Sequence, residues 1–303
     1  MPSFRSAKSQ ARHAVKKVTQ LGTSKQQGES GIIRSVGTVR AYEQSLRNVV
    51  GWMHSQRIGH SLNELNREMA ERYLSERCAT VSQSTLDQDR QALQAVLSCK
   101  LSVIKSQSGQ TSRSKPLSET SRIYSSEQFN MVLAKLSVEQ RFAVQLSAAT
   151  GLRAHEIYTL RRISEQPKSA GRPWDRERHL GQSGIVYTAR GKGGLVREIV
   201  IPNALARELE SYRLPIPATI RDRGITYKSY YALPGGQRLS AAFSKASKSA
   251  LGWSKGLHSV RHMFAQQNML WLMRQGKTYD QALLLVSQKL AHFRPAISER
   301  YLF

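Results

Sequence analysis

Short motifs in the second half of this chain constrain its fold more than any other feature of the sequence. They carry two arginines, a lysine, two histidines and a tyrosine, in the order Arg153, Lys192, His258, Arg261, His292 and Tyr301. Gly151 precedes the first arginine by two residues, and glycines flank the lysine on both sides. In this order the six residues suit a single site that acts on a phosphate group.

The charge of the chain indicates the class of its partner. Lys and Arg number 46 against 21 Asp and Glu, which gives a formal net charge of +25. Such an excess attracts polyanions and releases their counterions on contact. A ribosomal-type RNA binder or a protein on an anionic membrane would share this property. Aromatic residues make up only 7% of the chain, which disfavours a base-stacking single-strand binder. No apolar run approaches the roughly 18 residues that span a bilayer. Duplex DNA is therefore the predicted partner.

The length of 303 residues favours two domains, each large enough to bury a core. We predict a basic flexible arm over 1–30, a helical domain over 31–105, a linker over 106–122 and a second domain over 123–303. The arm is rich in Arg and Ser and holds a single acid, Glu29. Its amphipathic pattern resembles a transit peptide, and both a phosphate-contacting arm and plain disorder fit it.

The two cysteines indicate a reduced, cytosolic protein. Cys78 and Cys99 lie outside any CxxC spacing and within helical patterns. We therefore expect small core residues rather than a disulfide or a metal site.

Apolar spacing predicts a mainly α fold with one small β-hairpin. Three helical stripes lie within 36–105, the last of them behind Ser84 as N-cap. Ser125 to Gln128 fits a capping box. The segments 185–187 and 199–201 enclose a glycine-rich turn and predict the hairpin. The remaining helices are expected at 129–151, 204–213, 239–251, 258–274, 279–291 and 298–301.

Basic residues on the first helices are candidates for contact with a DNA backbone, although charged helix faces are usually only solvated. These candidates are Arg40, Arg47, Arg57, Arg90, Lys100 and Lys105.

Phosphate chemistry explains the choice of residue types. A phosphodiester gains negative charge as a nucleophile approaches, and a guanidinium meets two oxygens at once with a permanent charge. Arg153 and Arg261 are the candidates for this task. His258 shares a helix face with Arg261. The spacing of His258 and His262 resembles a zinc motif but lacks the glutamate between them, so a core-packed or intrahelical His262 is expected.

Four segments, ATGLRAHEI, RGKGGLVREIVIP, LHSVRHMFA and LAHFRPAISERY, resemble successive motifs of the tyrosine recombinases. That family includes phage integrases, Cre and the Xer-type chromosome resolvases. The resemblance covers about residues 120–301, and the helical segment before it is similar in kind to the core-binding domain of the family. It implies a helical, SAM-like core-binding domain and a catalytic domain that close on DNA as a C-shaped clamp.

The resemblance also implies roles for the cationic residues. Arg153 and Arg261 would clamp the phosphate, and Lys192 would protonate the departing 5′ oxygen. His258 would accept the proton of the tyrosine, whose hydroxyl ordinarily has a pKa near 10.

The last two residues complete the implied site. His292 would donate a hydrogen bond to the phosphate. Tyr301 would attack to give a 3′-phosphotyrosyl link and a free 5′ hydroxyl, without metal, ATP or any cofactor. Glu156 would orient Arg153, although a plain surface ion pair fits the spacing equally well.

Three features depart from the family pattern. The sequence stops two residues after Tyr301, where many relatives continue with a helix that docks into the neighbouring subunit. Residues 162–184 form a long insertion that would contact DNA or a partner. The stretch 261–292 is rich in apolar residues, which fits either a subunit interface or a buried helix.

These observations predict a site-specific DNA recombinase, or integrase, of a prokaryotic or mobile element, located in the cytoplasm with the nucleoid. It would act as a homotetramer on paired DNA sites, and accessory directionality factors or host DNA-bending factors are further candidate partners. Two alternatives remain: an enzyme that resolves or relaxes DNA through the same phosphotyrosine without partner exchange, and a catalytically silent accessory or architectural DNA-binding protein.

Overall fold

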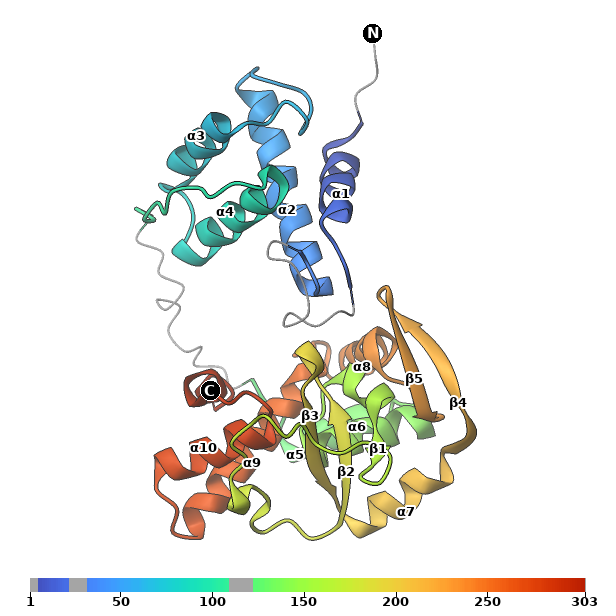
Figure 1. Cartoon of the computed structure of the whole chain (residues 1–303). Coiled ribbons are helices and arrows are strands. Elements are labelled where there is room, and N and C mark those ends of the chain that lie inside the picture. Colours follow the sequence, from blue (N-terminus) through green and yellow to red (C-terminus); the bar gives the residue numbers. More distant parts are fainter. Residues whose placement is uncertain (1–4, 22–31, 109–121, 303) are drawn as a thin grey trace. The chain divides into compact units, whose positions relative to one another are not determined.

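The computed structural model of the chain describes residues 5–21, 32–108 and 122–302. The chain divides into two compact units, Met1–Leu117 and Ser118–Phe303. Each unit has an apolar core of its own. Figure 1 shows the elements of both units.

The first unit is entirely helical over its described residues apart from one isolated β-bridge. Its helices are α1 (Ala7–Lys17), α2 (Val36–Ser55), α3 (Arg67–Arg77) and α4 (Gln83–Leu97). The predicted apolar stripes of the last three are confirmed, because Leu46 on α2, Leu74 on α3 and Leu93 on α4 are at most 1% exposed. The N-cap of α4 is Ser82, two residues before the predicted position.

The prediction of a flexible N-terminal arm is wrong for residues 5–21. Residues Ala7–Lys17 form helix α1, and Ala11 and Val15 are buried in the core of the first unit. The rest of the predicted arm and residues 109–121 of the predicted linker lie outside the described residues. Ser106, at the start of that linker, packs on the first unit: its main-chain N–H donates to Gln83 Oε1 at 2.8 Å.

The second unit contains a three-stranded antiparallel sheet. Its strands are β1 (Arg161–Arg162), β2 (Ile185–Arg190) and β3 (Val196–Ile201), in that order. β2 and β3 form the predicted hairpin, with Ile185 opposite Ile201. Short 3₁₀ turns occupy Ala154–Thr159, Arg176–His179 and Lys192–Gly194. The helices are α5 (Ser126–Leu133), α6 (Val138–Thr150), α7 (Asn203–Ser211), α8 (Gly236–Leu251), α9 (His258–Arg274), α10 (Tyr279–Lys289) and α11 (Pro295–Glu299). The predicted capping box at the start of α5 is present.

A second sheet was not predicted from the sequence. Strands β4 (Arg213–Asp222) and β5 (Ile225–Tyr231) form a two-stranded antiparallel hairpin. Pro215 and Pro217 argue against a strand, because proline cannot donate to a ladder. The register shifts between Arg213 and Ala218, so the prolines fall in the irregular part of β4. The hairpin therefore accommodates the two prolines that made a strand unexpected from the sequence.

Candidate active site

The first arginine of the site is placed by a helix end. α6 stops at Gly151, whose φ of +64° is the left-handed conformation that favours glycine. A Cβ atom there would lie 2.6 Å from the ring of Phe264 on α9, so the close approach also requires glycine. The chain then turns, and Arg153 precedes the 3₁₀ turn that carries Glu156.

Glu156 is fully buried and fixes Arg153 in two ways. Its carboxylate accepts from the Arg153 main-chain N–H at 3.0 Å and from Arg153 Nη1 at 2.7 Å. Burial alone would raise the pKa of Glu156. The charges of Arg197, Arg153 and Arg261 outweigh that effect and hold its pKa below the ordinary value. The ion pair that the spacing made possible is thus formed, and it is buried on the glutamate side rather than at the surface.

Arg197 belongs to this group but was missed in the sequence. It lies on β3, is 1% exposed, and donates from Nη2 to Glu156 Oε2 at 3.0 Å and to the Gly151 carbonyl at 3.2 Å. The signal was an arginine within the apolar run of a strand. A charged residue there needs a buried partner, because an isolated charge is costly to remove from water.

The second arginine, Arg261, projects from α9 and is 1% exposed. Its guanidinium donates to the carbonyls of Gly151 and Leu290, and Nη2 lies 3.3 Å from His292 Nε2. Burial and then the neighbouring charge of Arg153 lower the pKa of Arg261 to about 9, so it remains charged at neutral pH. The Gly151 carbonyl accepts from both Arg197 and Arg261, which ties the first motif to the third.

The ring of Tyr301 lies among three histidines. The centroid separations are 5.3 Å to His258, 4.5 Å to His262 and 5.0 Å to His292. The Arg261 guanidinium carbon is 5.7 Å from the centre of the tyrosine ring. Residues that are far apart in the sequence therefore meet around one phenol.

The His258 ring is neutral at neutral pH. Desolvation by the packed rings and then the charge of Arg261 lower the pKa of His258 to about 4, although the residue as a whole is exposed to solvent. A neutral imidazole has one ring nitrogen that can accept a proton. Burial and then the charges of Arg261 and Arg153 lower the pKa of His292 to about 3.

His262 and Gln266 hold the main chain of the tyrosine. Both side chains donate to the Tyr301 carbonyl, from His262 Nδ1 at 3.2 Å and from Gln266 Nε2 at 3.2 Å. They are four residues apart on α9, so they share one face of the helix. The His262 ring also stacks on the tyrosine ring with 24° between the planes. His262 is buried, as the sequence predicted, and its ring packs against that of Tyr301.

His292 lies in the strained loop between α10 and α11. The residues on either side of it, Ala291 and Phe293, have φ of +55° and +53°, which is uncommon outside glycine. His292 Nε2 accepts from Arg261, so its Nδ1 carries the proton and donates to Ser298 Oγ at 2.8 Å. The loop therefore fixes both the position and the tautomer of this ring.

The predicted insertion packs against this loop. The ring of Trp174 meets that of Phe293 edge-on at 4.6 Å. Gln288 at the end of α10 accepts from the Asp175 main-chain N–H at 2.7 Å and donates to the Pro173 carbonyl at 3.2 Å. Part of the segment 162–184 thus supports the chain that carries His292.

The main chain of Lys192 lies in the turn between β2 and β3. The turn borders the buried carboxylate, because a Cβ atom on Gly191 would lie 2.9 Å from Glu156 Oε1. Gly193 within the turn has a φ of +80°. The glycines on both sides of Lys192 thus meet two requirements, a close approach and a left-handed conformation.

Comparison with known proteins identifies the fold. Residues 33–102 match the family described as phage integrase, N-terminal SAM-like domain. The crystal structure of XerH site-specific recombinase bound to palindromic difH substrate, a post-cleavage complex, is similar with a TM-score of 0.54. Identity is 14%, and the match covers 98% of this chain and 90% of that chain. A lambda integrase dimer bound to a COC′ core site is similar with a TM-score of 0.50 and 12% identity, over 88% of this chain and 71% of that chain.

The chain has the tyrosine recombinase fold. The fold predicted from the four motifs is therefore confirmed, and the matched SAM-like region spans α2, α3 and α4. Comparison with curated protein sequences gives no significant match.

The basic residues that the sequence analysis proposed for contact with the DNA backbone all lie in the first unit. Arg47 and Arg90 are half-buried, whereas the other four candidates, Arg40, Arg57, Lys100 and Lys105, are exposed. Arg90 also pairs with Asp87 at 3.4 Å. The four exposed residues are thus the better placed to meet a partner.

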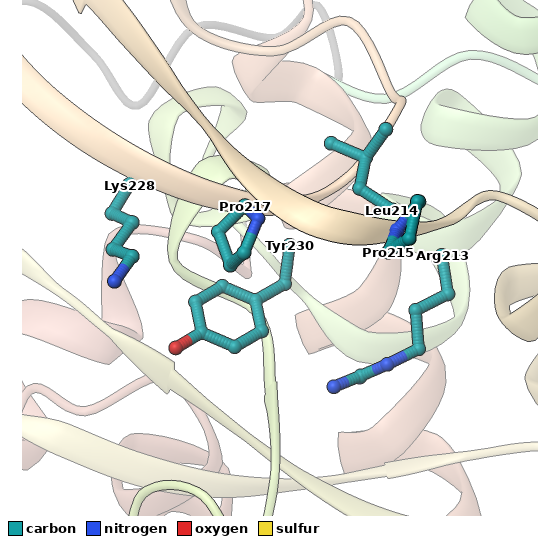
Figure 2. A pocket seen from close by; sticks show the side chains of 6 residues that line it. All are labelled: Arg213, Leu214, Pro215, Pro217, Lys228 and Tyr230. Atoms are coloured by element: carbon teal, nitrogen blue, oxygen red, sulfur yellow. The ribbon is translucent and has the colours of Figure 1, made fainter.

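A hollow of about 560 Å³ lies beside the β4–β5 hairpin, and Figure 2 shows its lining side chains. The Arg161 guanidinium lies 3.7 Å from the centre of the Tyr230 ring at this place. None of the residues clustered around Tyr301 lines the hollow. Over residues 5–21, 32–108 and 122–302, no group of three or more His, Cys, Asp or Glu is arranged to hold a metal ion. No helix in the same residues is long and apolar enough to cross a membrane.

Proposed function

We propose that this protein cleaves and rejoins duplex DNA through a 3′-phosphotyrosine at Tyr301, as a site-specific recombinase. The observation that carries the proposal is the packing of the Tyr301 ring among His258, His262 and His292, 5.7 Å from the Arg261 guanidinium. A phenol is a weak nucleophile unless an acceptor and nearby cations assist it, and this cluster supplies both.

The first step forms one bond and breaks another at phosphorus. The Tyr301 oxygen attacks the phosphate while its proton passes to the neutral His258. Arg153 and Arg261 stabilise the charge that develops on the non-bridging oxygens. The 5′ oxygen departs with a proton from Lys192, which leaves a free 5′ hydroxyl.

His292 is assigned to the same phosphate as a hydrogen-bond donor, which requires the ring proton to move to Nε2 when DNA replaces the Arg261 contact, so that Ser298 Oγ then donates to Nδ1. The second step reverses the first, since a 5′ hydroxyl attacks the phosphotyrosine and releases Tyr301. The protein–DNA bond conserves the energy of the phosphodiester, so the proposal requires neither ATP nor metal.

The tyrosine recombinase fold supports a partner of the same kind as those in the two similar structures, which are bound to DNA sites. We therefore extend the proposal to duplex DNA as substrate and to a homotetramer that joins two sites. A strand-exchange assay on two sites distinguishes this recombinase from an enzyme that only resolves or relaxes DNA.

Covalent trapping in cells tests the proposal. Cells that express the protein or its Tyr301→Phe variant are lysed in denaturant, and DNA attached to protein is sequenced. We expect discrete sites with the unaltered protein alone. Equal recovery from both proteins would instead support a silent DNA-binding protein.

A further inference from the structure

Helix α1 precedes the matched SAM-like region and is fixed to the first unit by one face only. Ala11 and Val15 on this face are buried in the core. Gln10 is also buried: it donates to the His60 carbonyl at 2.9 Å and accepts from the Leu62 main-chain N–H at 2.9 Å. A buried amide with satisfied partners fixes the position of a helix.

The end of α1 is tied down separately. The Ile33 N–H donates to the Val18 carbonyl at 2.8 Å, and the Gln20 N–H donates to the Ile33 carbonyl at 2.9 Å. These bonds join the residues after α1 to the segment before α2, and Figure 1 shows the two helices side by side. The helix is therefore a rigid part of the unit.

An exposed flank of α1, beside its buried face, carries a row of cations. Lys8, Arg12 and Lys16 are spaced four residues apart, so they lie along one stripe, and all three are exposed. The helix contains no acidic residue. Within the described parts of the chain, none of the three has a carboxylate within 4.0 Å.

Helix α3 in the same unit is built differently. Its exposed arginines are matched by glutamates one turn away, with Arg67 at 3.1 Å from Glu71 and Arg72 at 3.0 Å from Glu76. The charge of α3 is thus locally compensated, whereas the described residues place no carboxylate beside the exposed cations of α1.

We infer that the stripe of Lys8, Arg12 and Lys16 binds the phosphate backbone of duplex DNA, as a contact added to those of the SAM-like region and of the Tyr301 cluster. The stripe spans about 12 Å along the helix. A duplex of that length carries about seven phosphates. Three cations held in a row position a backbone and do not read bases. The inference rests on the proposed function only for its choice of DNA as the polyanion.

An anionic membrane is the less suitable partner for α1. A helix that lies on a membrane needs an exposed apolar face beside its cations. The apolar face of α1 is instead occupied by the core of the first unit. The structure thus offers cations without an insertion surface.

The salt dependence of DNA binding tests the inference and needs no recombination site. The full chain, the variant Arg12→Gln/Lys16→Gln and the control Arg67→Gln/Arg72→Gln are compared on an arbitrary 30-base-pair duplex by fluorescence anisotropy. Both variants lose two positive charges from exposed helix positions. Since each phosphate contact contributes about 0.9 to the slope of log K against log salt, the α1 variant should have a slope smaller by about 1.8. The control should keep the slope of the unaltered protein.

Two results would overturn the inference. If the two variants had equal slopes of log K against log salt, the stripe would contribute no more to DNA binding than other surface charges do. Weaker binding of phosphatidylserine vesicles, with DNA binding unchanged, would assign the stripe to a membrane. If the unaltered protein failed to bind the duplex at all, the proposed function would fail together with this inference.

Discussion

Replacement of Glu156 by glutamine should destabilise the second unit strongly. Gln has nearly the same shape and can still accept from the Arg153 main chain, so the change removes mainly the charge. Glu156 and Arg197 form an ion pair in which both side chains are 1% exposed. Removal of one partner of such a pair leaves an uncompensated buried charge and costs about 3–5 kcal/mol. At roughly 2–4 °C per kcal/mol, the melting temperature of the unit should fall by roughly 6–20 °C.

The pH dependence of this loss follows from the lowered pKa of Glu156. The unfolded state takes up a proton near the ordinary value of 4.5, whereas the folded state stays ionised to lower pH. The stabilisation by Glu156 is therefore complete above about pH 4.5 and is lost as the pH falls further. The stability gap between the unaltered protein and Glu156→Gln should narrow in acid.

Glu177 is the matched control, because its pair with Lys277 at 2.8 Å is 55% exposed on the glutamate side. Glu177→Gln should cost less than about 1 kcal/mol. The double variant Glu156→Gln/Arg197→Met should recover part of the stability lost by Glu156→Gln. Calorimetry or urea unfolding measures all four proteins. A loss below about 1 kcal/mol for Glu156→Gln, at every pH, would refute the buried network.

Three further results are expected. His262→Phe and Gln266→Leu each remove one donor to the Tyr301 carbonyl, a bond worth about 1 kcal/mol. Hydrogen exchange at the Leu302 amide should therefore become about fivefold faster. The control variant Gln275→Leu, at the C-cap of α9, should leave that exchange rate unchanged. Trp174→Ala should weaken the loop that carries His292 and lower the rate of adduct formation at saturating DNA, with rescue by Trp174→Phe; an effect on DNA affinity alone would contradict this. Since the pKa of His258 is lowered to about 4, adduct formation should hold steady from about pH 8 to pH 6 and fall only in stronger acid. A fall centred near pH 6.5 would contradict a neutral His258.

Local patterns in the sequence predicted the elements that depend on neighbours in the chain. The capping box at Ser125 and the hairpin of β2 and β3 follow from nearby residues and were found in place. The motif order assigned Arg261, His292 and Tyr301 to one site, and the structure brings their side chains together, whereas their catalytic roles stay a prediction. In these cases the identity and spacing of the residues are sufficient for the prediction.

Contacts between distant residues account for what the sequence did not reveal. The position of Arg197 in the apolar run of a strand implied a buried partner, but only the fold shows that this partner is Glu156. α1 has a narrow apolar face, so its packing depends on Gln10 meeting the segment around Leu62. The role of Trp174 was hidden for the same reason, since its partner Phe293 lies more than a hundred residues away.

The identity of the covalent bond tests the central claim most directly. The protein is incubated with its DNA site, the adduct is digested with protease and nuclease, and the peptide that carries nucleotide is sequenced by mass spectrometry. We predict a single modified residue, Tyr301, joined to a 3′ phosphate, with a free 5′ hydroxyl on the other DNA end. Attachment at another residue, or through a 5′ phosphate, would contradict the mechanism.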